Sequence, residues 1–488
     1  MTNSTNRRRF LRESVLTAAG AGLASSIPAT TWSQVTGAND DIRMGIVGMN
    51  GLGRTHIARF HKMKGARVVA LCDVDKRVLA REAKKFEARK EKVTAYVDIR
   101  RMLDDKNVDA ICVVTPNHWH SLMTIWACQA GKDVKVEKPV SHNIWEGRQM
   151  VLAAEKYNRI VQAGTESRSD PALKEAFEYI QAGNLGKILC ARGFCYKRRT
   201  SIGKVTKPTK VPDYIDYNLW TGPAPLVPLM RKSLHYNWHW VWATGNGDIG
   251  NQGAHEMDMC RWALGEDRPP RRVISIGGRF GYDDDAETAN TQLAFFDYEK
   301  APLIFEVRGL PMKSGMNAMD HYRGARVGIV IECENGYFSG GVGGGVVYDN
   351  SGNKIKQFKS GGGRGHSANF LKAVRSRKSS DLNAHIPKGH VSASLSHMAN
   401  ISHRLGQEAS PDEIRESLKT TKFVTDRFEQ LHKHLEANSV DPDRTRITLG
   451  AGLQFDPDTE KFTGTLANEA NRLATRNYRK PFVVPENV

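Results

Sequence analysis

Short runs rich in β-branched residues alternate with segments of helical periodicity from residue 42 to residue 163. The runs are almost wholly apolar, as expected for parallel strands that helices cover on both faces. Six strand–helix units in a row predict a doubly wound parallel sheet of the Rossmann type over residues 41–165. The expected strands are Ile42–Val47, Arg67–Cys72, Val93–Tyr96, Ala110–Val114, Val134–Glu137 and Ile160–Ala163. The clearest expected helices are Arg54–Lys64, Lys76–Ala88, Ser121–Ala130 and Trp145–Tyr157.

A glycine-rich turn, Gly48–Gly53, joins the first expected strand to the first expected helix. It reads Gly-Met-Asn-Gly-Leu-Gly, with Asn50 where dinucleotide-binding turns usually carry their second glycine. Glycine is favoured there because the backbone must come close to a pyrophosphate at the helix N-terminus. The residues predicted to bind the cofactor in this turn are Gly48, Asn50, Gly51, Leu52 and Gly53. The alternative is a glycine turn that only starts a helix.

Asp73 stands at the end of the second expected strand, twenty residues after Gly53. A carboxylate at this place accepts hydrogen bonds from the ribose hydroxyls of NAD and repels the 2′-phosphate of NADP. We therefore expect NAD or NADP as the cofactor, with NAD favoured, although Lys76 and Arg77 leave NADP open. The alternative role for Asp73 is that of a cap on the helix that follows.

The pattern changes after about residue 165, where alternating runs predict an open, mainly antiparallel sheet in an α+β domain over residues 166–440. The expected strands are Arg272–Ile276, Thr291–Phe296, Leu303–Val307, Val327–Glu332, Val346–Tyr348 and Lys354–Phe358. Asp349–Gly352 is typical of the turn between the last two. The expected helices are Ala368–Ser376, Ser392–Arg404 and Pro411–Ala437. We expect an irregular tail over residues 441–488.

The chain is basic: it has 71 Lys and Arg against 53 Asp and Glu, a formal charge of +18. The basic residues are spread along the sequence without a nucleic-acid-binding motif, so we interpret them as a solvated surface. The seven cysteines are scattered without a CxxC pair, which favours buried thiols over disulfides or metal ligands. No apolar run reaches the ~20 residues that a membrane-spanning helix needs. We therefore expect neither a nucleic-acid partner nor a membrane anchor.

The first 34 residues have the organisation of an export signal. Residues 7–11 read Arg-Arg-Arg-Phe-Leu, and a mildly apolar stretch over residues 15–27 precedes Pro28 and Ala29. A charged start, a short apolar core and small residues beyond it are typical of a signal peptide, here in its twin-arginine form. We therefore expect a periplasmic protein that is exported in the folded state. The alternative is a basic amphipathic helix.

Two short motifs follow the fourth and fifth expected strands: Thr115–His120, which reads Thr-Pro-Asn-His-Trp-His, and Glu137–Pro139, which reads Glu-Lys-Pro. Together with the glycine turn and Asp73, these motifs resemble the Gfo/Idh/MocA oxidoreductase family, named for glucose–fructose oxidoreductase and inositol dehydrogenase. The segments Asp216–Pro225 and Tyr478–Phe482 resemble the exported bacterial branch of that family. The resemblance covers essentially the whole chain beyond the signal.

The resemblance implies roles for the residues of both motifs. Those that would line the nicotinamide half of the cofactor are Thr115, Pro116, Asn117 and His120. Glu137 would touch the nicotinamide ribose, and Lys138 would lie between the nicotinamide and the substrate, with a cis peptide bond before Pro139. The resemblance also implies a second domain whose open sheet faces the cofactor domain and is often used for dimerisation. We therefore expect a homo-oligomer.

Lys138 has a chemical argument of its own. A lysine at the carboxyl end of a parallel strand points into the crevice where ligands bind in this class of sheet. Burial beside a cationic nicotinamide lowers the pKa of an amine, so the neutral form becomes available as a base. The alternative is an exposed lysine at a strand end, the commoner fate of this residue type.

The segment Gly245–Asp258 corresponds, by the resemblance, to a second catalytic motif whose usual order is Asp-x-x-x-His. His255 is present, but the residue four positions before it is Asn251. An amide does not exchange protons at neutral pH, although it hydrogen-bonds hydroxyls. We therefore assign proton work to Lys138 and His255 and substrate positioning to Asn251. Asp248 is a candidate replacement for the missing carboxylate, and a core histidine bonded to backbone is the alternative for His255.

Tryptophans alternate at positions 238, 240 and 242, so on a strand they would share one face, with His235 and His239 on the other. Aromatic faces suit a sugar ring and histidines suit its hydroxyls, so we predict that Tyr236 and His239 position the substrate. Core packing is the alternative for the tryptophans. These histidines and His255 lack a carboxylate at zinc spacing, so no metal site is predicted.

Together these observations predict an enzyme, an NAD(P)-dependent oxidoreductase that acts on a carbohydrate or polyol. Lys138 would take the proton from a ring hydroxyl while hydride passes to the nicotinamide, and His255 would bond that oxygen. Because the periplasm lacks a nicotinamide pool, we expect the cofactor to be tightly bound and recycled in one site. Two alternatives remain: a redox-assisted glycoside hydrolase or lyase, which Asn251 favours, and a non-catalytic sugar-binding protein of the same fold.

Overall fold

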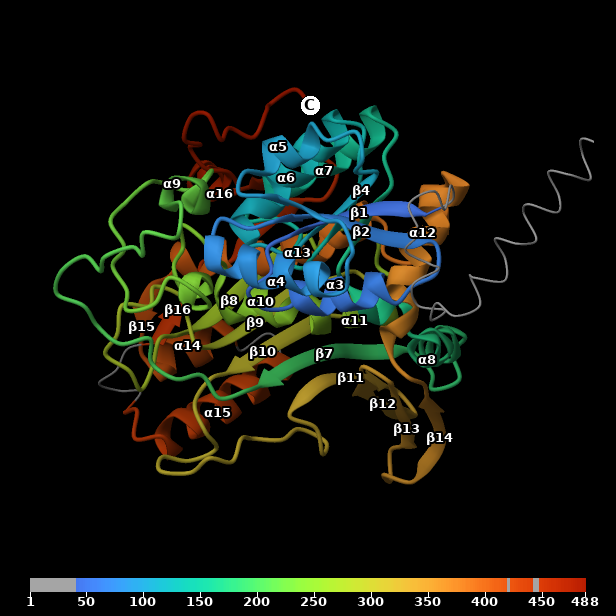
Figure 1. Cartoon of the computed structure of the whole chain (residues 1–488). Coiled ribbons are helices and arrows are strands. Elements are labelled where there is room, and N and C mark those ends of the chain that lie inside the picture. The colour runs from blue at the N-terminus through green and yellow to red at the C-terminus, as the bar shows by residue number, and fades with distance from the viewer. Residues whose placement is uncertain (1–40, 419–421, 442–446) are drawn as a thin grey trace, which may run out of the picture.

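The computed structural model describes residues 41–418, 422–441 and 447–488. The predicted export signal, residues 1–34, lies outside these residues. Figure 1 shows the chain as two layers of sheet, with helices α11 (Gly253–Leu264) and α13 (Ile386–Arg404) between them. α13 packs against α7 and β6 of the first layer and against β8 of the second, so it joins the two halves of the molecule.

Residues 41–165 form the expected parallel sheet. In this range six strands pair in the order β3-β2-β1-β4-β5-β6, all of them parallel. The strands are β1 (Ile42–Val47), β2 (Ala66–Cys72), β3 (Thr94–Tyr96), β4 (Ala110–Val113), β5 (Asp133–Val136) and β6 (Val161–Ala163). The helices are α3 (Gly53–His61), α4 (Lys76–Ala88), α5 (Ile99–Leu103), η1 (Asn117–Trp119), α6 (His120–Gln129) and α7 (Ile144–Lys156). The strand order reverses between β1 and β4, which is where ligands bind in sheets of this kind.

Apolar side chains pack against both faces of this sheet, which explains why its strands have no polar face. Phe60 of α3 and Phe86 of α4 are buried on one face. Leu122 of α6 and Met150 of α7 are buried on the other, and Figure 1 shows the two helix pairs on opposite sides of the strands. Burial of each such side chain contributes about 1.5–3 kcal/mol, so this packing stabilises the sheet.

The remaining described residues contribute a second, mainly antiparallel sheet. Its main path is β14-β13-β12-β11-β7-β10-β9-β8-β16-β15, with β17 paired to β8 and β18 to β17. The strands are β7 (Ile188–Tyr196), β8 (Arg272–Gly278), β9 (Thr291–Asp297), β10 (Leu303–Arg308), β11 (Val327–Cys333), β12 (Gly336–Gly341), β13 (Gly344–Asp349), β14 (Lys354–Lys359), β15 (Gln407–Ala409), β16 (Ile447–Leu449), β17 (Leu453–Asp456) and β18 (Lys461–Thr463). The hairpin turn predicted at Asp349–Gly352 joins β13 and β14.

This half also contains α-helices and short 3-10 turns besides α11 and α13. They are η2 (Glu166–Ser169), α8 (Pro171–Gln181), α9 (Tyr217–Thr221), η3 (Asn237–Trp240), α10 (Gly247–Asn251), η4 (Gly363–Gly365), α12 (His366–Ser376), η5 (Ser379–Asp381), α14 (Pro411–Leu418), α15 (Lys422–Ala437) and α16 (Ala467–Leu473). Within the single helix predicted over Pro411–Ala437, the described residues are helical over Pro411–Leu418 and Lys422–Ala437, and residues 419–421 lie outside the described ranges.

The tail differs from the irregular segment that the sequence predicts. β16 and β17 pair with β8, whose backbone groups on that side would otherwise form an unpaired edge. Beyond α16 the chain returns to the first domain, where Phe482 and Val484 are buried in its core. Figure 1 shows this last segment beside α5, α6 and α7. Residues distant in sequence therefore complete both domains.

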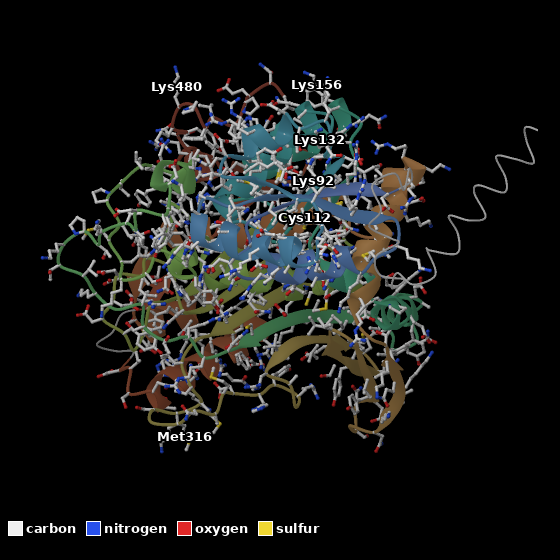
Figure 2. The ribbon with its side chains drawn as sticks, viewed as in Figure 1. Lys92, Cys112, Lys132, Lys156, Met316 and Lys480 are labelled. Carbon is white, nitrogen blue, oxygen red and sulfur yellow. The ribbon has the colours of Figure 1, made fainter. Side chains whose placement is uncertain are left out.

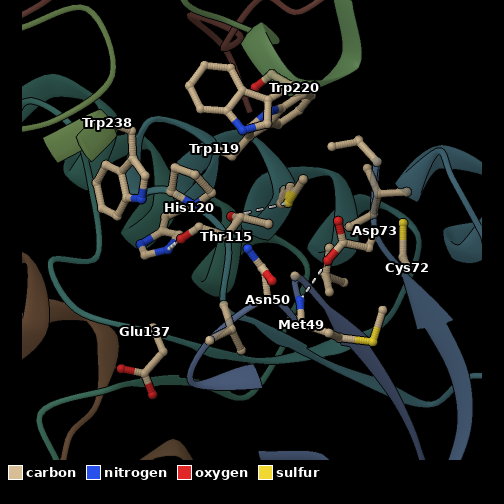
Figure 3. Close-up of a pocket in the computed structure, with 18 of the residues that line it drawn as sticks. Met49, Asn50, Cys72, Asp73, Thr115, Trp119, His120, Glu137, Trp220 and Trp238 are labelled. Carbon is tan, nitrogen blue, oxygen red and sulfur yellow. Dashed lines mark hydrogen bonds between the residues drawn. The ribbon is translucent and has the colours of Figure 1, made fainter. Parts of the chain in front are cut away.

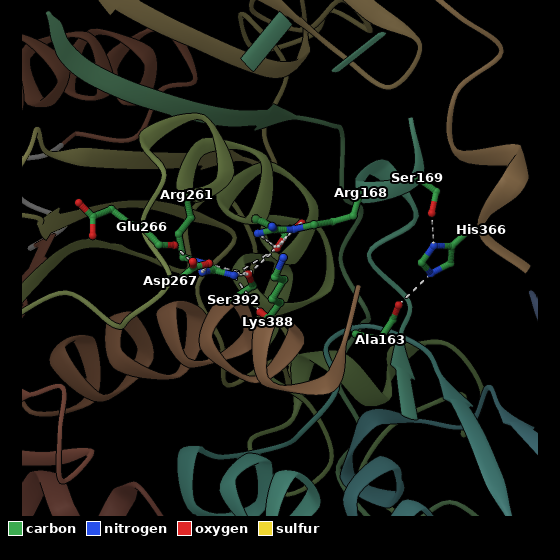
Figure 4. Close-up of polar contacts among 10 residues, drawn as sticks. Ala163, Arg168, Ser169, Arg261, Glu266, Asp267, His366, Lys388 and Ser392 are labelled. Atoms are coloured by element: carbon green, nitrogen blue, oxygen red, sulfur yellow. Dashed lines mark hydrogen bonds and ion pairs between the residues drawn. The ribbon is translucent and has the colours of Figure 1, made fainter. Parts of the chain in front are cut away.

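Buried charges join the elements that surround α11. Arg168 of η2 contacts Asp258 of α11 at 3.0 Å, and both side chains are almost completely buried. Ser392 of α13 donates to Asp258 at 2.6 Å and accepts from Arg261 at 3.0 Å. Figure 4 shows Arg168, Arg261 and Ser392 converging between α11 and α13. Each charge has a partner, which a buried ion pair requires.

All seven cysteines lie in the described residues, where they are buried and form no disulfide. Figure 2 shows Cys112 among the strands, whereas the exposed Lys156 and Lys480 lie at the rim of the first domain. Among the described residues, none of the helices combines the length and the apolar character needed to cross a bilayer.

Candidate active site

A cavity of about 370 Å³ lies between the carboxyl ends of the parallel strands and a segment of the second domain. The predicted site residues that line it are Gly48, Asn50, Gly51, Leu52, Asp73, Thr115, Pro116, His120, Glu137, Lys138, Tyr236 and Asn251. Those that lie outside its lining are Gly53, Asn117, His239 and His255. Figure 3 shows Glu137 and Asp73 on opposite sides of the cavity, with Asn50 and Thr115 between them.

The glycine turn has the close backbone packing that its sequence predicts. Gly48 has a φ of +82°, and a Cβ atom there would lie 2.8 Å from the carbonyl oxygen of Val114. A Cβ atom on Gly53 would lie 1.9 Å from the carbonyl oxygen of Gly48, so neither position accepts a side chain without a shift. A Cβ atom on Gly51 would meet nothing within 4 Å. The turn therefore leaves a backbone cradle open to the cavity, which fits a pyrophosphate.

Asp73 is held at the end of β2 by backbone groups. Its carboxylate accepts from the amide of Met49 at 2.8 Å and from the amide of Asp75 at 3.0 Å. Burial raises the pKa of Asp73 above its ordinary value. The cap of α4 is Asp75, which accepts from the amides of Arg77 and Val78. The helix-cap alternative for Asp73 is therefore wrong, and its carboxylate faces the cavity instead.

His120 of the Thr115–His120 motif lines the cavity and is held by two backbone carbonyls. The ring nitrogens of His120 lie 2.7 Å from the carbonyl oxygen of Pro139 and 2.8 Å from that of Thr115. His120 therefore ties this motif to the turn that carries Lys138. Asn117 is buried away from the cavity and donates to the side chain of Asn246. Asn117 therefore lies outside the cavity lining and joins the two domains, and its nicotinamide contact stays a prediction.

Lys138 is half-buried directly after β5, and its peptide bond to Pro139 is cis. Its ammonium donates to the backbone carbonyl of Asn251. Burial lowers the pKa of Lys138, and the carboxylates of Glu137, Glu256 and Asp248 oppose this shift. The arrangement provides an amine whose proton is held less firmly than that of an exposed lysine.

The position four residues before His255, where the family has a carboxylate, is Asn251. The candidate replacement, Asp248, lies three residues earlier. The side-chain amide of Asn251 donates to Asp248 at 3.3 Å. Arg199 binds both oxygens of Asp248, at 2.6 and 2.7 Å, so this carboxylate is buried and neutralised. His255 lies on α11, half-buried, and burial together with the charge of Lys138 lowers its pKa to about 3. His255 is therefore neutral at physiological pH.

The aromatic segment forms a 3-10 turn rather than a strand, so the alternation of its tryptophans does not define two faces. Tyr236 precedes the turn with a φ of +65°, is 63% exposed and accepts from Arg199 at 3.2 Å. Tyr236, Trp220 and Trp238 line the cavity. His239 is buried outside it against the carbonyl of Tyr236, and burial lowers its pKa to about 4. The structure therefore brings Tyr236 to the site but not His239.

A segment of the second domain covers the dinucleotide end of the cavity. The amide of Lys76 donates to the carbonyl of Tyr214 at 3.0 Å, and His235 contacts Asp75 at 3.1 Å. The indole of Trp119 donates to the carbonyl of Leu219 at 3.0 Å. These contacts join the segment to the ends of β2 and β4.

His56, which is not predicted from the sequence, lies on α3 against Glu137. Its Nε2 is 2.8 Å from Oε1 of Glu137, and both side chains are buried. One atom each of His56, Glu137 and Glu166 lies within 4.8 Å of the others, a spacing that a metal ion also accepts. However, Arg59 pairs with Glu166, which favours ion pairs over a metal site. A histidine inside an amphipathic helix carries no sequence signal for this contact.

The sequence matches two family profiles. Residues 42–165 match an oxidoreductase family described by its NAD-binding Rossmann fold, and residues 180–301 match that family's C-terminal α/β domain. The two matches together span about half of the chain. The protein belongs to the Gfo/Idh/MocA oxidoreductase family. The resemblance stated from the motifs is confirmed.

Individual proteins match parts of the chain at the level of sequence. A levoglucosan dehydrogenase of Pseudarthrobacter phenanthrenivorans is 29% identical over 179 residues, or 36% of this chain and 38% of that protein. Glycosyl hydrolase family 109 protein 2 of a Shewanella species is 32% identical over 172 residues, or 32% of this chain and 38% of that protein. The chain thus spans about two fifths of the length of these relatives.

A solved structure of similar fold covers about three quarters of the chain. A levoglucosan dehydrogenase in complex with NADH aligns with a TM-score of 0.56 at 16% identity, covering 74% of this chain and 97% of that one. At this identity the likeness shows the fold, a Rossmann domain followed by a mainly antiparallel α+β domain. The predicted fold class is therefore confirmed.

Proposed function

We propose that this Gfo/Idh/MocA protein is an NAD-dependent oxidoreductase that transfers hydride between a bound nicotinamide cofactor and a carbohydrate or polyol hydroxyl. The observation that carries the proposal is one cavity that connects Gly48–Leu52 and Asp73 with Lys138 and Asn251. One end has a backbone cradle and a ribose-binding carboxylate, and the other has an amine with a lowered pKa. The related levoglucosan dehydrogenase supports the substrate class.

The residues of the cavity divide the work between binding and proton transfer. The glycine turn and Asp73 bind the pyrophosphate and adenosine ribose, and Glu137 lies beside the nicotinamide ribose. When bound, the nicotinamide supplies the hydride acceptor. The Nζ atom of Lys138 accepts the proton of the substrate hydroxyl, which a neutral amine does efficiently near its own pKa. Asn251, which lines the cavity, orients the hydroxyl, whereas the bond proposed from neutral His255 to the same oxygen requires the substrate to reach beyond the cavity lining.

The charges at the adenosine end favour NAD over NADP. Asp73 lines the cavity there, so a 2′-phosphate would meet its carboxylate. The guanidinium of Arg77 stacks over the ring of Tyr214 at 3.3 Å and is thereby engaged away from a phosphate. We expect a higher kcat/KM with NAD than with NADP in steady-state assays of cofactor-depleted protein.

The segment that covers the cavity supports a tightly bound cofactor. Its backbone contacts with Lys76 and Trp119 would have to break before the dinucleotide leaves. The deciding experiment is to heat the natively purified protein and to identify the released small molecules by mass spectrometry. We expect stoichiometric nicotinamide dinucleotide. Release of no such molecule, together with no turnover of added cofactor and sugars, would overturn the proposal.

A redox-assisted glycoside hydrolase is the second candidate. The neutral Asn251 in place of a carboxylate and the 32% identity to a family 109 glycosyl hydrolase favour it. In this reaction a sugar hydroxyl is oxidised transiently and reduced again, so the cofactor returns to its first state within one turnover. Glycoside cleavage without net reduction of the bound cofactor would select this candidate over the dehydrogenase.

We further propose that the protein is exported to the periplasm by the twin-arginine route. The support is the order of residues 7–34, with its arginine pair, apolar stretch and small residues. Replacing Arg7 and Arg8 together with lysine is expected to leave the protein in the cytoplasmic fraction. Equal periplasmic amounts of the variant and the parent would contradict this route.

A further inference from the structure

His56 is a buried titratable group that contacts Glu137 and that the mechanism above does not use. It is 1% exposed, and its Nε2 lies 2.8 Å from Oε1 of Glu137, the residue directly before Lys138. We propose that His56 is a positioning residue: by neutralising Glu137 it keeps Lys138 available as an uncharged amine. The inference rests on the proposed function, in which Lys138 accepts the substrate proton.

The carboxylate of Glu137 is fixed in place by its surroundings. Glu137 is 6% exposed, one of its oxygens faces His56, and the other accepts from the amide of Lys138 at 3.3 Å. A Cβ atom on Gly164 would lie 2.8 Å from that second oxygen, so β6 closes the remaining side. The carboxylate therefore cannot turn away from Lys138, and its charge must be compensated where it stands.

Several elements present charges to Lys138. The titratable groups that face Lys138 or its neighbour Glu137 are Lys135 and Glu137 of the β5 segment, His56 of α3, His120 of α6, Glu166 of η2, Arg199 after β7, Asp248 of α10, His255 and Glu256 of α11, and His366 of α12. Arg199 neutralises Asp248, and Arg59 neutralises Glu166. Burial raises the pKa of Glu256 to about 8, so this carboxyl is largely protonated at neutral pH. Glu137 is the remaining carboxylate, and His56 is its partner.

His56 holds Glu137 in the charged state, and Cys112 together with Glu137 favours the charged state of His56. Burial lowers the pKa of His56, but Cys112 and Glu137 outweigh burial and raise it to about 10. Burial also raises the pKa of Glu137, but the hydrogen bond and charge of His56 outweigh this and leave it far below its ordinary value. Without the imidazolium, an uncompensated carboxylate would face Lys138. It would stabilise the ammonium and reduce the fraction of free amine at a given pH.

The test is the charge state of Lys138 in the His56→Gln variant, which keeps a side-chain N–H donor but loses the positive charge. In the purified full-length protein, the rate at which an amine-reactive ester labels Lys138 is measured against pH by peptide mass spectrometry. We expect the midpoint to rise by about one pH unit, with about tenfold slower labelling below it. The pH profile of kcat/KM for sugar oxidation is expected to move in the same direction.

A matched control lies on the same helix. His61 of α3 pairs with Glu91 at 2.9 Å, away from the cavity, so His61→Gln loosens the helix similarly. We expect this variant to leave the labelling midpoint of Lys138 unchanged. His56→Arg, which restores a positive charge, is expected to return the midpoint toward that of the parent protein.

The outcomes separate this inference from the proposed function. If His56→Gln does not fold, the protonation of the His56 ring is followed by NMR in the parent protein, where an imidazolium is expected through the neutral range and a neutral imidazole would overturn the proposal. Equal midpoints in the parent and the folded variant would overturn the role of His56. A shifted midpoint in a protein that oxidises no sugar or polyol would support the charge relation and would reject the dehydrogenase activity instead.

Discussion

The two ends of the cavity are built in different ways. At the dinucleotide end, Gly48, Asp73 and Thr115 come together because they follow the carboxyl ends of β1, β2 and β4, which lie side by side. At the substrate end, Tyr236 and Asn251 come from a short turn and a short helix of another domain and reach Lys138 only through tertiary packing. The sheet topology therefore places the residues of the dinucleotide end. The residues of the substrate end are placed by tertiary contacts, among them the buried pair of Arg199 and Asp248.

Removal of the Lys138 amine is expected to reduce activity more than any other change. The reason is that the cofactor and the substrate are both proposed to bind beside this amine. Lys138→Met preserves the length of the side chain but removes the base, so we expect kcat for sugar oxidation to fall by about a thousandfold. Bound cofactor, measured by nicotinamide fluorescence, is expected to stay near the level of the parent. The exposed Lys92→Met serves as the control. Unchanged turnover would favour a non-catalytic sugar-binding protein.

Disruption of the buried ion pair beneath the substrate end is expected to destabilise the fold. Asp258→Asn leaves the guanidinium of Arg168 without its counter-charge in a buried position, which costs about 3–5 kcal/mol of unfolding free energy. Chemical denaturation measures this loss. Asp213→Asn, which changes a side chain that is 87% exposed and that pairs with the exposed Lys210, is expected to cost under about 0.5 kcal/mol. Equal losses in both variants would contradict the structural role of the pair.

The glycine turn allows a direct test of the dinucleotide end. In Gly53→Ala the new methyl group collides with the carbonyl of Gly48, so we expect a loss of about 1–3 kcal/mol and weaker cofactor binding. In Gly51→Ala the methyl group points into open space, so we expect an unchanged unfolding midpoint but about tenfold weaker cofactor binding. If both variants lose stability equally, the cradle at Gly51 is not open.

Asn251→Asp tests whether the substrate end depends on the absence of a charge. A carboxylate at this position would stabilise the ammonium form of Lys138 and so raise its pKa. The acid limb of kcat/KM for oxidation, which follows the appearance of the free amine, is then expected to move up by about one pH unit. Since burial lowers the pKa of His255 to about 3, this histidine does not contribute to that limb. An unmoved limb would show that position 251 does not influence the base.

The sequence predicts the dinucleotide end well because its signals are local. The runs Ile42–Val47 and Ala110–Val114 coincide with β1 and β4 to within one residue, since a wholly apolar run bounded by turns has few other solutions. Asp73 follows from its place in that pattern. The pairing of His56 with Glu137 leaves no such trace, because their positions are 81 residues apart and meet only in three dimensions.

The substrate end and the tail are predicted less well for the same physical reason. The tryptophan alternation suggests a strand, but the positive φ of Tyr236 and the 3-10 turn after it remove the period of two on which that interpretation depends. Strands β16 to β18 contain three or four residues each, too few for a periodic signal, and β16 and β17 form because β8 offers them backbone partners.

The packing of Phe482 against Trp119 has a consequence for how the protein matures. The centroids of the two rings lie 5.4 Å apart, and Arg479 donates to the backbone carbonyl of Asn218 at 3.0 Å. The segment that covers the cavity therefore packs against residues that are synthesised more than two hundred positions later. A nascent chain that has formed the parallel sheet therefore still lacks the contacts that position the covering segment. Capture of the dinucleotide becomes a late step, reached after translation has passed residue 482.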